Sequence, residues 1–173
     1  MGKKKKNKKK FVENIELYKE FYFFEINRKH ELNNAINLPI LVLTLIFSIN
    51  FYLLNQELSE KIVCVVKLLT FISFLSITFS IYFLISSFSN FAKSHSYLEL
   101  ANMSEVLSFD EAHKDSVFEF QKFLKEEFAK CSSHNFTINK NRTEDLANSK
   151  KGIFISLIST FIFSIVYLVS ILN

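Results

Sequence analysis

A polar run before the last apolar stretch is the part of the sequence best equipped for binding chemistry. It reads HNFTINKNR, and its candidate side chains are His134, Asn135, Thr137, Asn139 and Arg142. Asparagine amides donate and accept hydrogen bonds, and a guanidinium holds carboxylate or phosphate through two parallel bonds. The run is either a polar loop joining helices or a surface that binds a ligand or partner, with Lys150 and Lys151 available to phosphate.

Hydroxyl side chains form a second candidate site, because they recur at helical spacing inside apolar stretches. Small polar residues on one helix face let helices approach closely and hydrogen-bond, and the same face would also line a water-filled path in an oligomer. The candidate packing or pore residues are Ser73, Ser76 and Ser80 in one stretch, extended by Thr70, and Ser156, Thr160 and Ser164 in another.

A single lysine, Lys67, interrupts the second apolar stretch near one end. A lysine at that depth can extend its ammonium to the membrane interface. Alternatively, it stands at a pore mouth or pairs with an acidic neighbour, Glu57 or Glu60.

The motifs of known catalytic and metal sites are missing. The sequence contains no glycine-rich phosphate loop, no GxSxG and no HExxH, and its four histidines share no ligand spacing. Cys64 and Cys131 define neither a disulfide framework nor a metal site. Adjacent carboxylates such as Asp110 and Glu111 point about 100° apart on a helix. We therefore expect no enzymatic activity and no cofactor.

Three uncharged stretches of 17, 21 and 21 residues organise the chain: Leu38–Leu54, Leu68–Phe88 and Gly152–Leu172. A bilayer core of about 30 Å requires roughly 20 apolar residues as a helix. A chain of 173 residues is too small to hide three such helices from water. We predict three transmembrane helices.

Basic residues predict the orientation. Seven lysines lie between Lys3 and Lys10, and the segments before the first span and between the second and third spans hold nearly all the other basic residues. Positively charged flanks remain in the cytoplasm. The N-terminus is therefore expected inside and the C-terminus outside a bacterial inner membrane. The lysine tail would bind its anionic inner leaflet rather than nucleic acid, because the rest of the chain is net acidic.

The segments outside the spans are expected to be helical. Aromatic and aliphatic residues recur every three or four positions from residue 11 to 37, which predicts an amphipathic cytosolic helix. Between the second and third spans, Ser108 and Glu111 have the spacing of a capping box and predict a helix over 109–131. The polar run would then break this helix, and Thr143 would cap a short one leading into the third span.

Two stretches resemble a known group of proteins. YKEFYFFEINRKHELNNAINLPILVLTLIF and HNFTINKNRTEDLANSKKGIFISLI are similar to the approaches to the first and last spans of SLATT-like effectors in bacterial conflict systems. This resemblance implies a membrane effector of antiviral defence that oligomerises and permeabilises the inner membrane when a cytosolic sensor protein or nucleotide signal triggers it.

The expected fold is thus all-α, with three transmembrane helices, an N-terminal amphipathic helix and a cytosolic helical insert. A non-conducting membrane anchor or scaffold that recruits a cytosolic partner is the alternative function. The expected segments are a basic disordered tail at 1–10, the amphipathic helix at 11–37, a transmembrane hairpin at 38–91 with spans 38–54 and 62–91, the insert at 92–151 and the third span at 152–172.

Overall fold

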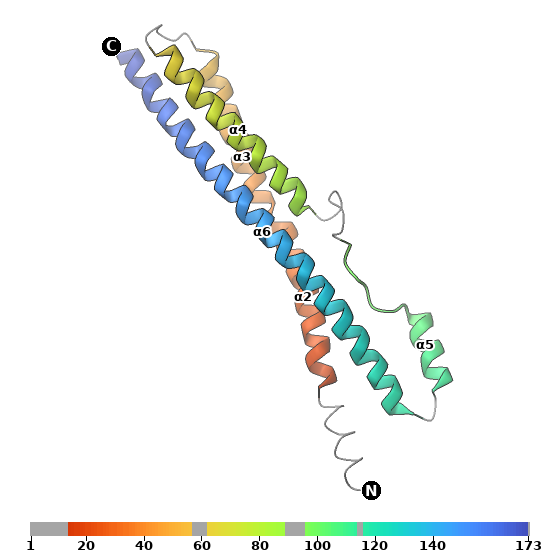
Figure 1. The fold of residues 1–173 in the computed structure, drawn as a ribbon. Coiled ribbons are helices and arrows are strands. Elements are labelled where there is room, and N and C mark those ends of the chain that lie inside the picture. The colour runs from red at the N-terminus through yellow and green to blue at the C-terminus, as the bar shows by residue number, and fades with distance from the viewer. Residues whose placement is uncertain (1–13, 57–61, 89–95, 114–115, 173) are drawn as a thin grey trace. The chain divides into compact units, whose positions relative to one another are not determined.

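The computed structural model describes residues 14–56, 62–88, 96–113 and 116–172, and the described residues contain helices but no strand. The lysine tail, Glu57, Glu60 and the last residues of the span expected at 62–91 lie outside this description. The helices are α2 (Ile15–Ala35), α3 (Asn37–Leu54), α4 (Val63–Ser87), α5 (Met103–Ala112) and α6 (Val117–Leu172), as Figure 1 shows.

The chain divides into two compact units. Of the described residues, the first unit, called the helical unit, comprises 14–31, 96–113 and 116–140. The second, called the membrane unit, comprises 32–56, 62–88 and 141–172. Helix α6 runs without interruption for 56 residues and contributes to both units. The two units are therefore connected by one continuous helical backbone.

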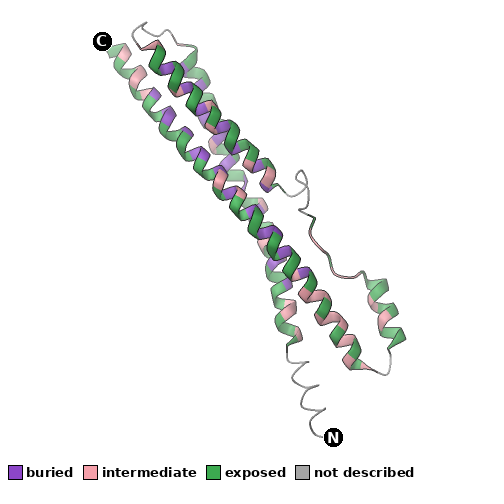
Figure 2. Cartoon of the chain, viewed as in Figure 1, coloured by how far each residue is buried: buried purple, intermediate pink, exposed green. Residues whose placement is uncertain are grey.

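Three helices are long and apolar enough to cross a membrane: the combined run Ile15–Leu54, then Val63–Ser87 and Val117–Leu172. Only 33%, 28% and 22% of the residues in their most apolar windows are buried within the chain. Figure 2 shows exposed positions in green along all three helices. Large apolar residues are among the exposed ones, such as Leu41, Phe71 and Phe161. Hydrocarbon is the solvent that tolerates such a surface. The protein is an all-α, multi-pass membrane protein with three spans.

The buried residues of the membrane unit follow alternating steps of three and four. This spacing averages 3.5 residues and is typical of helices that pack with a left-handed crossing. Many of these positions hold polar residues. The buried series are Pro39, Leu43, Ile46, Asn50 and Leu53 on α3, Val66, Thr70, Ser73, Ile77, Ser80, Leu84 and Ser87 on α4, and Leu146, Ser149, Ile153, Ser156, Thr160 and Phe163 on α6. Two further residues of α6, Gly152 and Ser159, are buried directly before members of this series.

The predicted capping box is wrong. The cap of helix α5 lies six residues before Ser108, at Asn102, whose side chain accepts a hydrogen bond of 3.0 Å from the backbone N–H of Glu105. Ser108 lies inside this helix and donates to the Glu105 carbonyl. The helix predicted over 109–131 is divided between α5, which ends at Ala112, and α6, which begins at Val117. An asparagine cap competes well with a serine cap, so either position could have begun the helix.

The predicted break at the polar run is also wrong, as is the short helix capped by Thr143. Helix α6 passes through both positions. The reason is that its buried stripe is polar here, because Asn135, Asn139 and Arg142 are fully buried. When a helix is recognised by the spacing of its apolar residues, a polar residue at a buried position looks like the end of that helix.

In the helical unit, α2 packs against the first part of α6. The ring of Tyr22, which is buried, lies 5.9 Å from that of Phe128, and the Lys125 ammonium lies 4.8 Å from the centre of the Tyr18 ring. The predicted amphipathic helix therefore lies against the predicted helical insert.

Candidate functional site: a polar core in the membrane unit

The amide of Asn50 is the centre of a polar cluster within the three spanning helices. Its Nδ2 lies within hydrogen-bonding distance of Thr160 Oγ1 (2.7 Å), Ser73 Oγ (3.1 Å) and the Ile46 carbonyl (2.9 Å). Ser73 Oγ also shares hydrogen bonds with Ser156 Oγ at 3.0 Å and Thr160 Oγ1 at 3.3 Å. The cluster therefore joins α3, α4 and α6 through side chains that are all buried.

The cluster contains hydrogen-bonding oxygen atoms that no group of the chain pairs with. Asn50 Oδ1 is buried without a hydrogen-bond partner in the structure, and so is Thr70 Oγ1, one turn from Ser73 on α4. An unpaired polar atom in a hydrocarbon environment costs about 1–3 kcal/mol. Such an atom is normally satisfied by water or by an ion.

Gly152 brings α6 very close to α4. A Cβ added at Gly152 would lie 2.2 Å from Ser80 Oγ, 3.0 Å from the Ser76 carbonyl oxygen and 3.0 Å from a ring carbon of Phe79. Only glycine fits this contact without movement of α4. Small residues at the interface are the usual means of close packing between membrane helices.

Arg142 is fully buried and contacts the end of α4. Its Nε donates to the Ser87 carbonyl at 2.7 Å, and its Nη2 donates to Asn33 Oδ1 at 2.7 Å. The last turn of α4, described throughout, holds no basic residue of its own. Arg142 thus provides from α6 the positive charge that stabilises the C-terminal end of a helix dipole.

The other members of the polar run hold an extended segment, residues 96–100, against α6. Asn135 accepts from the Leu98 N–H at 2.9 Å and donates to the Leu98 carbonyl at 3.1 Å. His134 Nε2 lies 2.9 Å from the Ser96 carbonyl oxygen, and Tyr97 donates to Asn139 Oδ1 at 2.5 Å. Asn135 thus provides the hydrogen bonds that this extended backbone would otherwise make to a neighbouring strand, which it lacks in the described chain.

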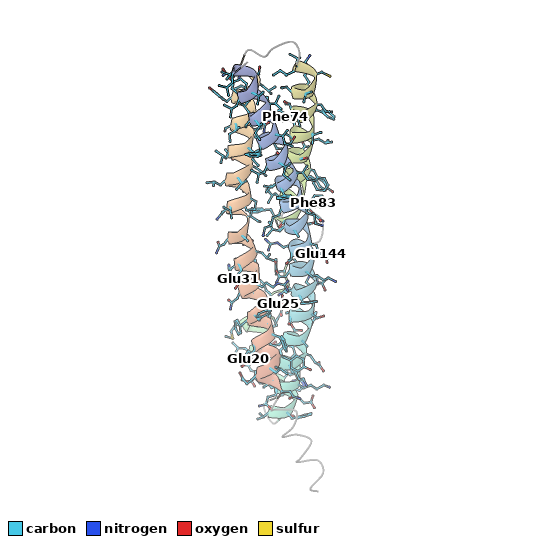
Figure 3. All side chains as sticks on the ribbon, turned by 90° about the vertical axis from the view of Figure 1, so that its left-hand side faces the viewer. Glu20, Glu25, Glu31, Phe74, Phe83 and Glu144 are labelled. Carbon is cyan, nitrogen blue, oxygen red and sulfur yellow. The ribbon has the colours of Figure 1, made fainter. Side chains whose placement is uncertain are left out.

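Asn139 also connects this segment to α2. Its Nδ2 donates to the Glu25 carbonyl and to the Glu25 carboxylate, both at 2.8 Å. Glu25, labelled in Figure 3, is 3% exposed, and Arg28 Nη1 lies 3.9 Å from its carboxylate. A buried carboxylate requires such partners.

The structure separates the predicted site residues into two groups. Asn135, Asn139 and Arg142 are buried and do not form an exposed surface, whereas His134 and Thr137 are exposed. Among the hydroxyl candidates, the buried ones are Ser73, Ser80, Ser156 and Thr160, whereas Ser76 and Ser164 are half-buried. Lys67 is exposed and takes no part in the polar cluster.

Sequence reasoning missed Asn50 and Gly152. Asn50 is an isolated amide in an otherwise apolar span, which is an expensive position, and that isolation was a usable signal. Gly152 stands at the start of the third span, where nothing in the sequence indicates which helix it meets. In the described part of the chain, no group of three or more His, Cys, Asp or Glu side chains is placed to hold a metal ion.

Burial sets the ionisation of two groups in the helical unit. The pKa of the Cys131 thiol is raised above its ordinary 9.0, first by burial and then by the Glu127 carboxylate. The pKa of the Tyr22 phenol is raised above its ordinary 10.0 by burial and then by Cys131. Because the unfolded chain ionises first, the free energy of unfolding should fall as the pH rises above about 9.

We predict that a maleimide distinguishes the two cysteines. Cys64 is exposed, whereas Cys131 is 1% exposed and its thiol donates to the Glu99 carbonyl at 3.4 Å. Because the thiolate is the reacting form, Cys131 in the folded protein should label at least about tenfold more slowly than Cys64 at pH 7.5. Mass spectrometry after timed labelling measures both rates, and denaturation in SDS is the control. Equal rates in the folded protein would contradict this burial.

Comparison with known proteins gave a single result. No family model, curated protein or solved structure matches this chain. The polar cluster, the Gly152 contact and the buried Arg142 are therefore the basis for a functional assignment.

Proposed function

We propose that the protein is a membrane effector that permeabilises a bilayer as an oligomer. The observation that supports this most is the polar cluster around Asn50. Close packing in a membrane needs only small residues such as glycine and alanine. An amide with an unfilled acceptor, Asn50 Oδ1, adds a polar surface that water or an ion can use once the helices separate.

The single chain corresponds to a closed state in this proposal. The hydroxyls of Ser73, Ser156 and Thr160 are bonded to one another or to Asn50, so the unit has no open path through its core. Opening would require α4 and α6 to move apart and expose these groups. Helix α6 belongs to both units, so a change in the helical unit has a direct covalent route to the core.

The proposed location is a bacterial inner membrane with the N-terminus and the helical unit in the cytoplasm and the C-terminus outside. The distribution of basic residues supports this orientation. The resemblance to SLATT-like effectors supports a role in antiviral defence. The trigger would be a cytosolic sensor protein or a nucleotide signal acting on the helical unit.

A leakage experiment tests the proposal. Full-length protein, reconstituted at a protein-to-lipid ratio high enough for the oligomer to form without its trigger, should release a dye trapped in liposomes. Asn50→Leu should lower the rate at least about tenfold, because the polar groups that lower the barrier for water and ions are lost. Thr78→Val is the matched control, since the Thr78 hydroxyl is exposed and donates only to the Phe74 carbonyl of its own helix. Equal rates for Asn50→Leu and the native chain would show that any path avoids this cluster.

A non-conducting anchor is the second candidate. The hydrogen bonds between stripe hydroxyls of different helices favour it, because these groups are then used in packing. For example, Ser73 Oγ lies 3.0 Å from Ser156 Oγ and 3.3 Å from Thr160 Oγ1. Liposomes that stay tight at every protein-to-lipid ratio, together with a soluble protein that copurifies with the chain, would support this candidate.

A further inference from the structure

An apolar surface on the helical unit remains uncovered after the fold and the polar core are accounted for. Phe21 and Phe24 on α2 are 53% and 59% exposed, Leu17 is 49% exposed, and Phe136 on α6 is 50% exposed. The three α2 residues lie at i, i+4 and i+7, so they share one helix face. We call these four residues the aromatic face. Large apolar side chains grouped in this way on a charged unit mark an interaction surface.

A cleft lies within the aromatic face. Its volume is about 360 Å³, and its lining comes from both helices: Tyr18, Phe21, Phe24, Glu25, Arg28, Ala129, Ser132, Ser133 and Phe136. Small residues of α6 form one part of the lining and phenyl rings form another. The surface therefore offers both a space for a side chain and aromatic rings that could enter such a space.

The charge of the cleft limits what can occupy it. Its two charged residues, Glu25 and Arg28, are 3.9 Å apart and offset each other. The Glu25 carboxylate already accepts a hydrogen bond from Asn139. A locally neutral cleft favours an uncharged, apolar occupant such as a phenyl ring over a phosphate or an acidic peptide.

We propose that the aromatic face binds the same face of a second copy of this chain, with phenyl rings of each copy entering the cleft of the other. An interface that contains both the projecting rings and the cleft is self-complementary, as a two-fold contact requires. The proposal deepens the proposed function, because it identifies the contact through which the oligomer begins to form.

The available area explains why this contact needs the membrane. An aromatic side chain buries about 150–250 Å² when covered. The exposed halves of the aromatic face therefore supply on the order of 300–400 Å² per copy, against about 800 Å² per partner in a stable complex. Such a contact is weak in free solution. Confinement to one bilayer raises the effective concentration of the copies and makes a weak contact sufficient.

Energy transfer between copies in liposomes tests the proposal. Full-length protein is labelled at the exposed Cys64 with donor or acceptor dye, and the two populations are reconstituted together. The native chain should show transfer above the level for randomly mixed proteins. The double variant Phe21→Glu/Phe24→Glu should lower the apparent affinity in the bilayer at least about tenfold, since aromatic contacts dominate interface energies.

Phe23→Glu is the matched control. Phe23 lies on the same helix at 49% exposure, but it does not line the cleft. Energy transfer retained in Phe23→Glu shows that the contact depends on the residues that line the cleft and not on the general hydrophobicity of α2. Circular dichroism of all three proteins verifies that the variants fold.

The remaining outcomes each overturn one proposal. Unchanged transfer in the double variant, or random transfer in the native chain, contradicts the self-contact. If the double variant instead loses binding to added vesicles or to a copurifying protein, the face binds lipid or a different partner. Dye release from the same liposomes separates the two proposals, because transfer without release rejects permeabilisation and keeps the contact.

Discussion

Substituting leucine for Gly152 is expected to prevent α6 from packing against α4 and to leave the membrane unit unfolded. Even a methyl group has no room, because its carbon would lie 2.2 Å from Ser80 Oγ and 3.0 Å from the backbone oxygen of Ser76. A serine hydroxyl can rotate away, but a backbone carbonyl cannot move without its helix. Leucine adds further atoms at the same point, so α4 must separate from α6.

Substituting alanine for Gly152 gives a change in stability that can be measured. Overpacking a tight contact costs about 1–3 kcal/mol, whereas alanine is favoured over glycine inside a helix by about 1 kcal/mol. We expect the balance to lower the free energy of unfolding of Gly152→Ala by up to about 2 kcal/mol. Thermal unfolding of the purified protein in detergent, followed by circular dichroism, measures the change.

Two further variants define the cause. Ala147→Leu adds bulk to an exposed position of the same helix and should leave the stability unchanged. Ser80→Ala removes the closest atom, so the double variant Gly152→Ala/Ser80→Ala should recover part of the loss. A Gly152→Ala protein more stable than the native chain by about 1 kcal/mol, the full helix gain of alanine, would show that α4 and α6 do not approach as closely as described.

Replacing Arg142 is the second change with a large expected effect. In Arg142→Met, the Ser87 carbonyl and Asn33 Oδ1 both lose the hydrogen bond that they accept from the guanidinium. Each buried acceptor left without a donor costs about 1–3 kcal/mol, so the free energy of unfolding should fall by a few kcal/mol. The last turn of α4 also loses the only basic group described at its end, so it should fray.

Hydrogen–deuterium exchange measures this fraying directly. The amides of Leu84 to Phe88, which bond within the last turn of α4, should exchange faster in Arg142→Met. Arg142→Lys should be intermediate, because an ammonium lacks the fork geometry that reaches two acceptors. Lys140→Met is the control, since Lys140 is exposed on the same helix. Native exchange rates in Arg142→Met would exclude a role of Arg142 at this helix end.

The polar run illustrates what sequence reasoning can miss. Its residues suggested a loop or a binding surface because polar residues usually face water. Here Asn135 and Asn139 are buried because they bond backbone groups of residues 98 and 25, which are distant in sequence. Local periodicity has no access to that pairing. The same applies to the hydroxyl stripe, where close packing and a water-lined path predict the same spacing.

The solvent of each segment was determined by the sequence itself. A span needs only a long enough run of apolar residues, because its backbone is satisfied within its own helix. That is a local property, and it placed three helices in hydrocarbon before any contact was known.

The tertiary structure alone decided which faces of those helices meet. The hydroxyl stripe indicated one face of α4 and one face of α6, but small polar residues do not indicate which helix each face meets. Asn50 bonds to Ser73 and Thr160, which lie 23 and 110 residues away along the chain. Gly152 and Arg142 likewise acquire their roles from α4. These contacts come from packing between distant segments, which no local stretch of the sequence encodes.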